Sequence, residues 1–167
     1  MRHAEWATFL ADGEIYALPV ADVYEVLMDQ RVLPVPLAPR HVLGLMNLRG
    51  HIVPAVDIRR LLGLLSWENR GGRIVAVAGM SMLGTSRWQG EAHFVVVRCA
   101  GERVALVVDD VGDVLELDEH GWRPAPETLP AEQLELVDGM FMQGKQVVLR
   151  VRAEGIAHMM GVTVPVA

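Results

Sequence analysis

The sequence has very little cysteine, and what it lacks excludes several classes of protein. Cys99 is the single cysteine among 167 residues, which excludes an intramolecular disulfide and a metal cluster held by several thiolates. Because Cys99 lies in the apolar stretch FVVVRCAG, we expect a buried, unreactive thiol. No apolar run reaches the roughly 18 residues that a membrane-spanning helix needs, and MRHAEWATFL at the N-terminus does not resemble a signal peptide. These absences predict a cytoplasmic protein.

Positive charge and catalytic motifs are scarce as well. The chain has 15 Lys and Arg against 21 Asp and Glu, a formal net charge of -6, and no basic stripe, so nucleic acid is not an expected partner. The six histidines have no metal-ligand spacing. No phosphate-binding glycine loop and no Gly-x-Ser-x-Gly nucleophile motif occur. The sequence therefore predicts no cofactor, no metal site and no enzymatic activity.

A group of aspartates is the nearest thing to a reactive cluster. Asp109 and Asp110 are adjacent, and Asp113 follows. Neighbouring residues of a strand point to opposite faces, so Asp109 and Asp110 are not expected to share a site. We interpret the group as a solvated strand end that leads into a turn.

What the sequence does contain is short, valine-rich segments separated by turn residues. Hydrophobic residues make up 51% of the chain and aromatic residues only 5%, so strands are favoured over helices. The segment EIYALPV follows the turn pair Asp12-Gly13, and the two strands of FVVVRCAGERVALVV flank a hairpin at Ala100-Gly101-Glu102. In GKQVVLRV, Val147, Leu149 and Val151 are expected to face inward. A mainly β fold is predicted.

The strand HIVPAVDI carries more detailed signals. Its residues alternate, and Pro54 cannot donate a ladder hydrogen bond, so we expect an edge strand or a bulge. The following DIRRLLG predicts a short helix with Asp57 as its N-cap and Gly63 at its end. A second short helix is predicted for EGIAHMMG, whereas RPAPETLP is expected to be an extended loop. Methionines are frequent near the C-terminus, at positions 140, 142, 159 and 160. We expect them to fill gaps in the core and not to form an adaptable partner surface.

Residues 67–91 do not fit this pattern. Loop-forming residues at both ends enclose the apolar stretch IVAVAGMSMLG. Because the stretch is short and uniformly apolar, periodicity does not decide between an extra hairpin and a flexible lobe.

The apolar run HVLGLMNLRGHIVPAVDIRRLLGL contains an isolated Arg-Gly pair, which a core strand has no use for. This segment resembles the most recognisable motif of the CheW family, the coupling proteins of bacterial chemotaxis. The resemblance spans about residues 9–161 and departs from the family in the extra length of 67–91 and in lacking an acidic residue before the final helix. The residues that match the motif are Gly44, Asn47, Arg49, Gly50, Pro54 and Asp57.

The resemblance implies two five-stranded SH3-like β-barrels packed around a shared hydrophobic core. On this expectation the chain is one domain, residues 1–167. Barrel 1 covers about 15–66, the insertion about 67–91, and barrel 2 about 92–152 together with the N-terminal strand. A C-terminal helix would cover about 153–161.

The implied function is a non-enzymatic scaffold. Such a protein couples the cytoplasmic tips of methyl-accepting chemoreceptors to the regulatory domain of a CheA-type histidine kinase, without inserting into the membrane. Two alternatives stay open. The chain could serve a non-flagellar pathway, such as twitching motility or surface-sensing second-messenger control, or it could be a peptide-binding barrel that acts independently of a kinase.

The resemblance also implies two sets of protein-binding residues. Arg49 would anchor the receptor, with a local ion pair to Asp57 or Glu25 as the alternative, and the glycines would permit close backbone approach or simply form tight turns. The expected receptor contacts are Arg49, Glu25, Gly44, Asn47 and Gly50. The expected kinase contacts are the exposed edge residues Val53 and Ala55, and a turn at Val111, Gly112 and Asp113.

Overall fold

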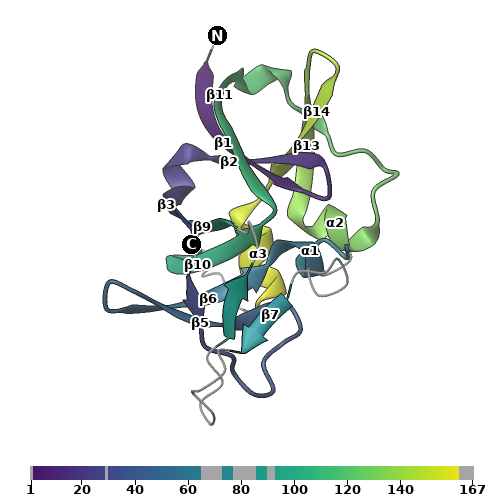
Figure 1. The fold of residues 1–167 in the computed structure, drawn as a ribbon. Helices are drawn as coiled ribbons and strands as arrows, with labels where there is room; N and C mark the ends of the chain where they lie inside the picture. Colours follow the sequence, from purple (N-terminus) through teal and green to yellow (C-terminus); the bar gives the residue numbers. More distant parts are fainter. Residues whose placement is uncertain (1, 29, 65–72, 77–85, 90–92, 162–167) are drawn as a thin grey trace.

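The structure is a computed structural model that describes residues 2–28, 30–64, 73–76, 86–89 and 93–161. Most of these residues lie in strands, which form two main sheets and one small sheet. In Figure 1 the larger sheet occupies the upper part of the molecule and the second sheet the lower part. The prediction of a mainly β fold is confirmed.

The larger sheet has six strands and is built from both ends of the chain. β1 pairs with β2 and β11, and the parallel pairing of β2 with β14 joins the N-terminal hairpin to the C-terminal one. In spatial order the strands are β11 (Asp110–Asp118), β1 (His3–Ala11), β2 (Glu14–Pro19), β14 (Gln146–Val151), β13 (Val137–Gln143) and β12 (Arg123–Pro124).

The second sheet has five strands from the middle of the chain. Its spatial order is β3 (Val23–Met28), β9 (His93–Cys99), β10 (Glu102–Val108), β6 (His51–Asp57) and β5 (Val42–Leu48). The predicted hairpin between β9 and β10 is present, with positive φ angles at Ala100 and Gly101. Such angles suit the two-residue turns that match strand twist.

The strand order differs from the predicted division of the chain. The sequence assigned residues 92–152 to barrel 2, whereas β9 and β10 pair with β3 and β6 in the five-stranded sheet. Likewise β2, placed in barrel 1 by the sequence, belongs to the six-stranded sheet. The main sheets therefore have six and five strands instead of five each. Long-range pairing decides this assignment, and strand-forming segments alone do not reveal it.

Pro54 belongs to an interior strand of the five-stranded sheet. β6 has β5 on one side and β10 on the other, so the edge-strand interpretation is wrong. The parallel pairing with β10 begins only at Ala55, and Pro54 itself pairs with Leu45 of β5. The proline therefore precedes the part of β6 that has neighbours on both sides. The β5–β6 ladder also shifts register between Val42 and Gly44.

A third, three-stranded sheet contains part of the insertion. Its order is β4 (Arg31–Val32), β8 (Ser86–Gln89) and β7 (Arg73–Ala76). β7 and β8 pair in antiparallel fashion, as the hairpin alternative requires. The other residues of 67–91 lie outside the described part of the chain, so the alternative of a flexible lobe stays untested.

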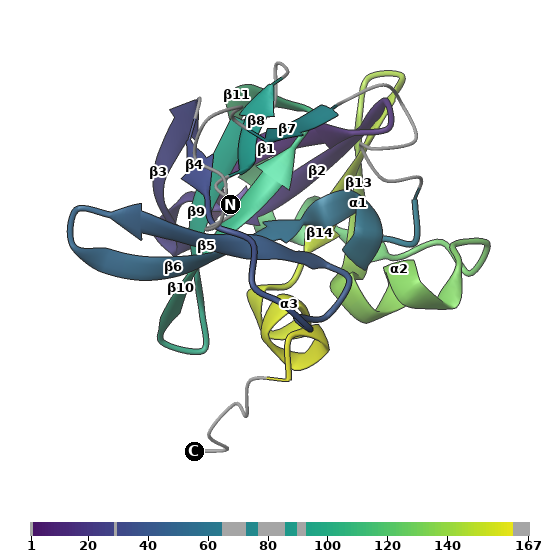
Figure 2. The ribbon, with the colours of Figure 1, turned by 60° about the horizontal axis from the view of Figure 1, so that its bottom comes forward.

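The described α-helices are short, and only α1 starts at a side-chain cap. In α1 (Ile58–Leu61) the side chain of Asp57 accepts a hydrogen bond from the Arg59 amide at 2.9 Å, and Gly63 follows with φ +68°. The predicted cap and stop are confirmed. The C-terminal helix is also confirmed as α3 (Ala153–Met159), which contacts β9 and α2 (Ala131–Leu136) (Figure 2). The sequence did not predict α2. The remaining helical turns are η1 (Val20–Asp22) and η3 (Glu119–Gly121).

The predicted shared core lies between the two main sheets. β10 is apolar on both faces. Val104, Leu106 and Val108 pack in this shared core. Ala105 and Val107 pack in a second cluster on the other face of the five-stranded sheet. A third cluster, around Trp6 and Leu117, packs on the six-stranded sheet. The three clusters explain why so few strands show simple alternation.

Cys99 belongs to the shared core and is 1% exposed. The expected burial is confirmed, and it raises the pKa of the thiol to about 12, which disfavours the reactive thiolate. Within the described residues, no helix is both long and apolar enough to span a bilayer.

Candidate functional site

The isolated Arg-Gly pair forms the tight turn between β5 and β6. Arg49 and Gly50 both have positive φ angles, +51° and +86°, which is typical of a two-residue hairpin turn. The Gly50 amide donates a hydrogen bond to Oδ1 of Asn47 at 2.9 Å. A Cβ at Gly50 would meet no atom within 4 Å, so the turn conformation is what favours glycine here.

The Arg49 side chain projects from this turn and is 78% exposed. Its Nη2 lies 3.0 Å from Oε2 of Glu25 on β3. β3 and β5 are the two outer strands of the five-stranded sheet, so the ion pair connects a turn at one edge with the strand at the other. Of the two predicted local partners, Glu25 is therefore the observed one.

Gly44 has a structural role within this chain. It is buried, and a Cβ there would lie 2.2 Å from the carbonyl oxygen of Leu33. Leu33 and Leu45 exchange two backbone hydrogen bonds of 2.8 Å across this contact. The close backbone approach that Gly44 permits is thus made by its own chain, and Gly44 lies in a strand instead of a tight turn.

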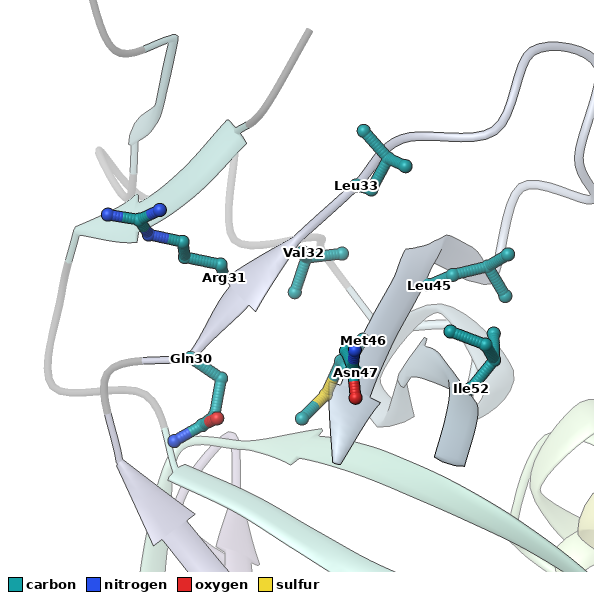
Figure 3. Close-up of a pocket in the computed structure, with 8 residues that line it drawn as sticks. All are labelled: Gln30, Arg31, Val32, Leu33, Leu45, Met46, Asn47 and Ile52. Atoms are coloured by element: carbon teal, nitrogen blue, oxygen red, sulfur yellow. The ribbon is translucent and has the colours of Figure 1, made fainter. Parts of the chain in front are cut away.

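An apolar hollow opens beside the Arg49 turn (Figure 3). Its volume is about 560 Å³, its floor includes Met46, and Ile52 at its rim is 64% exposed. The hollow forms where β4 leaves β5: Leu33 still bridges to Leu45, whereas Arg31 and Val32 pair with β8. Asn47 also lines it, so the hollow and the turn form one continuous surface.

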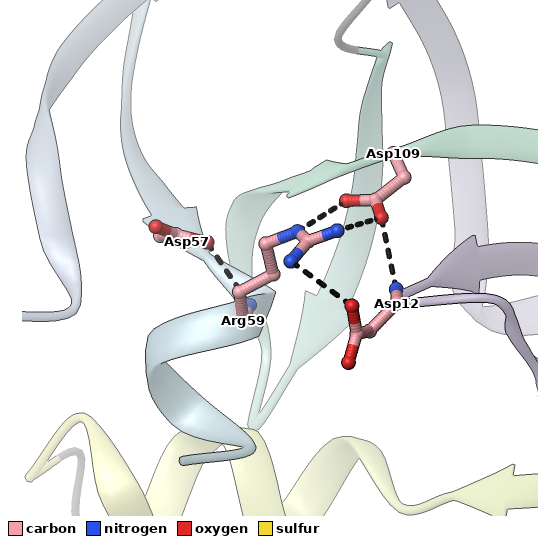
Figure 4. A network of polar contacts seen from close by, with 4 residues as sticks. All are labelled: Asp12, Asp57, Arg59 and Asp109. Carbon is pink, nitrogen blue, oxygen red and sulfur yellow. Dashed lines mark hydrogen bonds and ion pairs between the residues drawn. The ribbon is translucent and has the colours of Figure 1, made fainter. Parts of the chain in front are cut away.

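A second polar network lies inside the molecule (Figure 4). Arg59 of α1 is 1% exposed, and its Nε donates to Oδ1 of Asp109 at 2.6 Å. Its Nη2 pairs with the other Asp109 oxygen, and its Nη1 lies 3.6 Å from Oδ1 of Asp12. Asp12 in turn donates its backbone amide to Oδ2 of Asp109 at 2.9 Å. The interpretation of Asp109 as part of a solvated strand end is therefore wrong.

This network joins the two main sheets. Arg59 follows β6 of the five-stranded sheet, and Asp12 lies in the β1–β2 turn of the six-stranded sheet. Asp109 is the single residue between β10 and β11, where the chain passes from one sheet to the other. A buried guanidinium needs such partners.

Asp57 beside this network is fully buried. Burial raises the pKa of its carboxyl group to about 6, although the Arg59 amide and the nearby Arg60 act in the opposite direction. In the part of the chain that the structure describes, no three His, Cys, Asp or Glu side chains are placed to hold a metal ion.

Comparison with known proteins agrees with the fold and the turn motif. The model of the CheW-like domain matches residues 5–160. The chain belongs to the CheW-like family. It is 30% identical over 151 residues to the chemotaxis protein CheW of Klebsiella aerogenes, covering 90% of this chain and 79% of that protein. It is 24% identical to the chemotaxis protein CheW of Helicobacter pylori, covering 89% and 78%.

The fold also matches a solved CheW structure. The crystal structure of the scaffolding protein TtCheW from Thermoanaerobacter tengcongensis superposes with a TM-score of 0.72 at 23% identity, covering 90% of each chain. This similarity confirms the CheW fold. The resemblance read from the Arg49-Gly50 segment is thereby confirmed as well.

Some of the residues expected to contact a partner lie at the surface, and others are buried. The fold brings Arg49, Glu25, Asn47 and Gly50 together at one surface, whereas Gly44 is buried against Leu33 and Val32. Val53 and Ala55 are 1% and 0% exposed. The expectation that these two side chains are exposed is wrong, because their face of β6 packs in the second core cluster of the five-stranded sheet.

The last three expected contacts lie in strand β11 and not in a turn. A Cβ at Gly112 would meet Oγ1 of Thr8 at 2.3 Å, and this hydroxyl donates to the Asp113 carbonyl at 2.6 Å. The β1–β11 ladder shifts register here, so Gly112 serves an internal bulge. Asp113 is exposed and Val111 is half-buried.

Sequence reasoning missed two features of the site. The sequence analysis did not identify the hollow. The proline-rich segment LPVPL was a signal for an apolar surface, because its Leu33, Val35 and Leu37 are exposed. Sequence reasoning also missed the burial of Arg59, because the partners of this side chain come from distant parts of the sequence.

Proposed function

We propose that this chain is a non-enzymatic chemotaxis adaptor that couples methyl-accepting chemoreceptors to a CheA-type histidine kinase in the cytoplasm. The observation that carries the proposal is the exposed Arg49 at a tight hairpin turn, next to an apolar hollow, in a chain of the CheW-like family. Its relatives are named chemotaxis proteins, and the structural neighbour is described as a scaffolding protein.

The receptor surface in this proposal centres on the Arg49 turn. The guanidinium is held by one ion pair to Glu25, and 78% of the side chain stays accessible to a partner. A helical receptor tip supplies apolar side chains for the hollow and an acidic group for the arginine, as in other helix-in-groove interfaces. Asn47 and Gly50 maintain the turn that aims Arg49.

The kinase surface is placed elsewhere. Because Val53 and Ala55 are buried, the proposed kinase surface is limited to the exposed Asp113 and the half-buried Val111 and Gly112 on β11. β11 is an outer strand of the six-stranded sheet, so a partner strand or loop has access to its free edge.

Isothermal titration calorimetry with purified components tests the proposal. The ligands are a soluble receptor fragment that contains the helical hairpin tip and the isolated kinase regulatory domain, both from the organism that encodes this chain. We expect one-to-one binding to each. Binding to neither would refute the adaptor function, and binding to a peptide without any kinase complex would favour the peptide-binding alternative.

The cellular pathway needs a separate experiment. Deleting the gene and scoring swimming, twitching and second-messenger levels distinguishes the flagellar pathway from the two non-flagellar ones. An adaptor of a single pathway will affect the output of that pathway alone.

A further inference from the structure

Two arginines face each other on the five-stranded sheet. Arg98 of β9 and Arg103 of β10 are register partners in the antiparallel ladder. Like charges directly opposite each other destabilise a sheet. In the described part of the chain, neither guanidinium forms an ion pair with a carboxylate within 4.0 Å. A protein with a net charge of -6 thus concentrates positive charge at this point.

Tyr24 completes the group. It lies on the neighbouring strand β3, where the ladder to β9 shifts register between Val23 and Glu25. The residue is 44% exposed, and the guanidinium carbons of Arg103 and Arg98 lie 4.5 Å and 5.3 Å from the centre of its ring. Hydrogen bonds from Arg103 and then Arg98 lower the pKa of the Tyr24 hydroxyl. Both guanidinium groups therefore lie over the same tyrosine ring.

This group borders a second hollow, which shares Ile52 with the one in Figure 3. The second hollow has a volume of about 410 Å³ and lies between the β5–β6 hairpin and the β9–β10 hairpin. Tyr24 and Arg103 line its polar side together with His51, and Ile52, Pro54 and Met160 line its apolar side. Because His51 directly follows Gly50 and Ile52 also lines the first hollow, the second hollow is continuous with the Arg49 turn.

We propose that Tyr24, Arg98 and Arg103 form an oxyanion site that receives a carboxylate of the chemoreceptor tip. The proposal rests on the receptor role given above and adds the chemistry of the contact. Guanidinium groups bind carboxylates in a bidentate manner, and the apolar side of the hollow accepts a neighbouring apolar side chain of the same receptor helix. Charge complementarity supports an acidic partner, and continuity with the Arg49 turn supports the receptor over the kinase.

The nearby acidic residues do not neutralise this site. Glu102 lines the same hollow, and Asp22 interacts electrostatically with Arg98. Burial raises the pKa of the Asp22 carboxyl group, although Arg98 lowers it. Within the described residues neither acidic residue forms an ion pair with Arg98 or Arg103 within 4.0 Å, so both guanidinium groups beside the Tyr24 ring are available to an incoming carboxylate.

The test measures the affinity of the full chain for the soluble receptor-tip fragment by calorimetry. The double variant Arg98→Ala/Arg103→Ala is expected to bind about tenfold more weakly, with a smaller dependence of the dissociation constant on salt. The control variant Arg123→Ala/Lys145→Ala removes the same charge from exposed positions of the six-stranded sheet and is expected to bind like the wild type. Circular dichroism checks the fold of each variant.

A second variant covers the case in which the alanine variant does not fold. Arg98→Lys/Arg103→Lys keeps the charge and loses the bidentate geometry, so an affinity loss of a few-fold is expected. Unchanged affinity in a folded arginine variant, or equal loss in the control, would overturn the oxyanion site. Loss of kinase binding alone would overturn the assignment to the receptor. If the wild-type chain does not bind the receptor fragment at all, the proposed function itself fails.

Discussion

Arg49 carries the functional proposal at the scale of single residues. Its guanidinium has a local partner in Glu25 at 3.0 Å, yet the side chain is 78% exposed. Exposed ion pairs of this kind contribute little to stability, usually below about 1 kcal/mol. The residue is therefore poorly explained by folding alone and well placed to contact a partner.

Reversing this charge separates the two roles of Arg49. We expect Arg49→Glu to change the free energy of unfolding by about 1 kcal/mol or less, while capture of the receptor fragment weakens by about tenfold. Circular dichroism and a pull-down assay measure the two effects. The matched control is the charge swap Arg49→Glu/Glu25→Arg, which restores the local ion pair. Recovery of receptor binding in the swap would show that Arg49 acts only through Glu25.

Asp57 predicts a pH dependence of stability. Its folded-state pKa of about 6 exceeds the reference value of 3.8, so between these values the folded state holds a proton that the unfolded state has released. The resulting stabilisation is present below about pH 4 and is lost as the pH rises to about 6. The burial of the ionised carboxylate then costs on the order of 2 to 3 kcal/mol.

Asp57→Asn removes this titration and retains an N-cap oxygen. Urea unfolding at about pH 4 and about pH 7 is expected to show that the wild type loses stability, relative to the variant, as the pH rises. Parallel pH profiles of the two proteins would contradict the buried, protonatable state of Asp57.

At the scale of elements, the sequence predicted the features that neighbouring residues determine, but not those that depend on long-range strand pairing. The cap at Asp57, the stop at Gly63 and the β9–β10 hairpin were readable because neighbouring residues determine each of them. The burial of Val53 and Ala55 was not readable. β6 is covered on both faces, and only the pairing with β10 and the three core clusters reveal this.

The site shows the same limit. The Arg49-Gly50 turn was recognisable from its motif, whereas the hollow depends on the point where β4 leaves β5 to pair with β8. Arg59 looked like one basic residue of a short helix, and its burial depends on Asp109, which is 50 residues away. Contacts of this range leave no local pattern in a single sequence.

The insertion is the element whose removal we expect the fold to survive. Replacing residues 67–91 by a short Gly-Ser linker removes β7 and β8, and leaves β4 without its pairing partner. Within the described residues, β7 and β8 pair with each other and with β4 and join neither main sheet, so cooperative unfolding should persist. Denaturant titration followed by circular dichroism measures this. Loss of a cooperative transition would show that the insertion belongs to the core.

At the scale of the whole molecule, the shared core and the Arg59 network hold the two main sheets together. The network is the polar counterpart of the core, because Arg59, Asp12 and Asp109 come from both sheets and the link between them. Because the two main sheets are held together, the surfaces proposed for the receptor and the kinase keep a constant position relative to each other. An adaptor requires this property.

Removing one side of this network should destabilise the entire molecule. Asp109→Ala leaves the buried Arg59 without its main partner, at a cost of about 3 kcal/mol. The neighbouring Asp110→Ala is the control, because the Asp110 side chain is 64% exposed and its loss should cost less than about 1 kcal/mol. Urea unfolding followed by circular dichroism and by fluorescence should give one coincident transition for both variants. Equal stabilities would contradict the role of Asp109.

The central claim is that this chain holds a receptor and a kinase at the same time. Co-sedimentation tests it most directly, with membrane vesicles that carry the chemoreceptor, the CheA-type kinase and this chain in the same mixture. The account predicts that substantially more kinase pellets with the vesicles when the chain is present, and that Arg49→Glu reduces this increase. An equal amount of pelleted kinase with and without the chain would contradict the account.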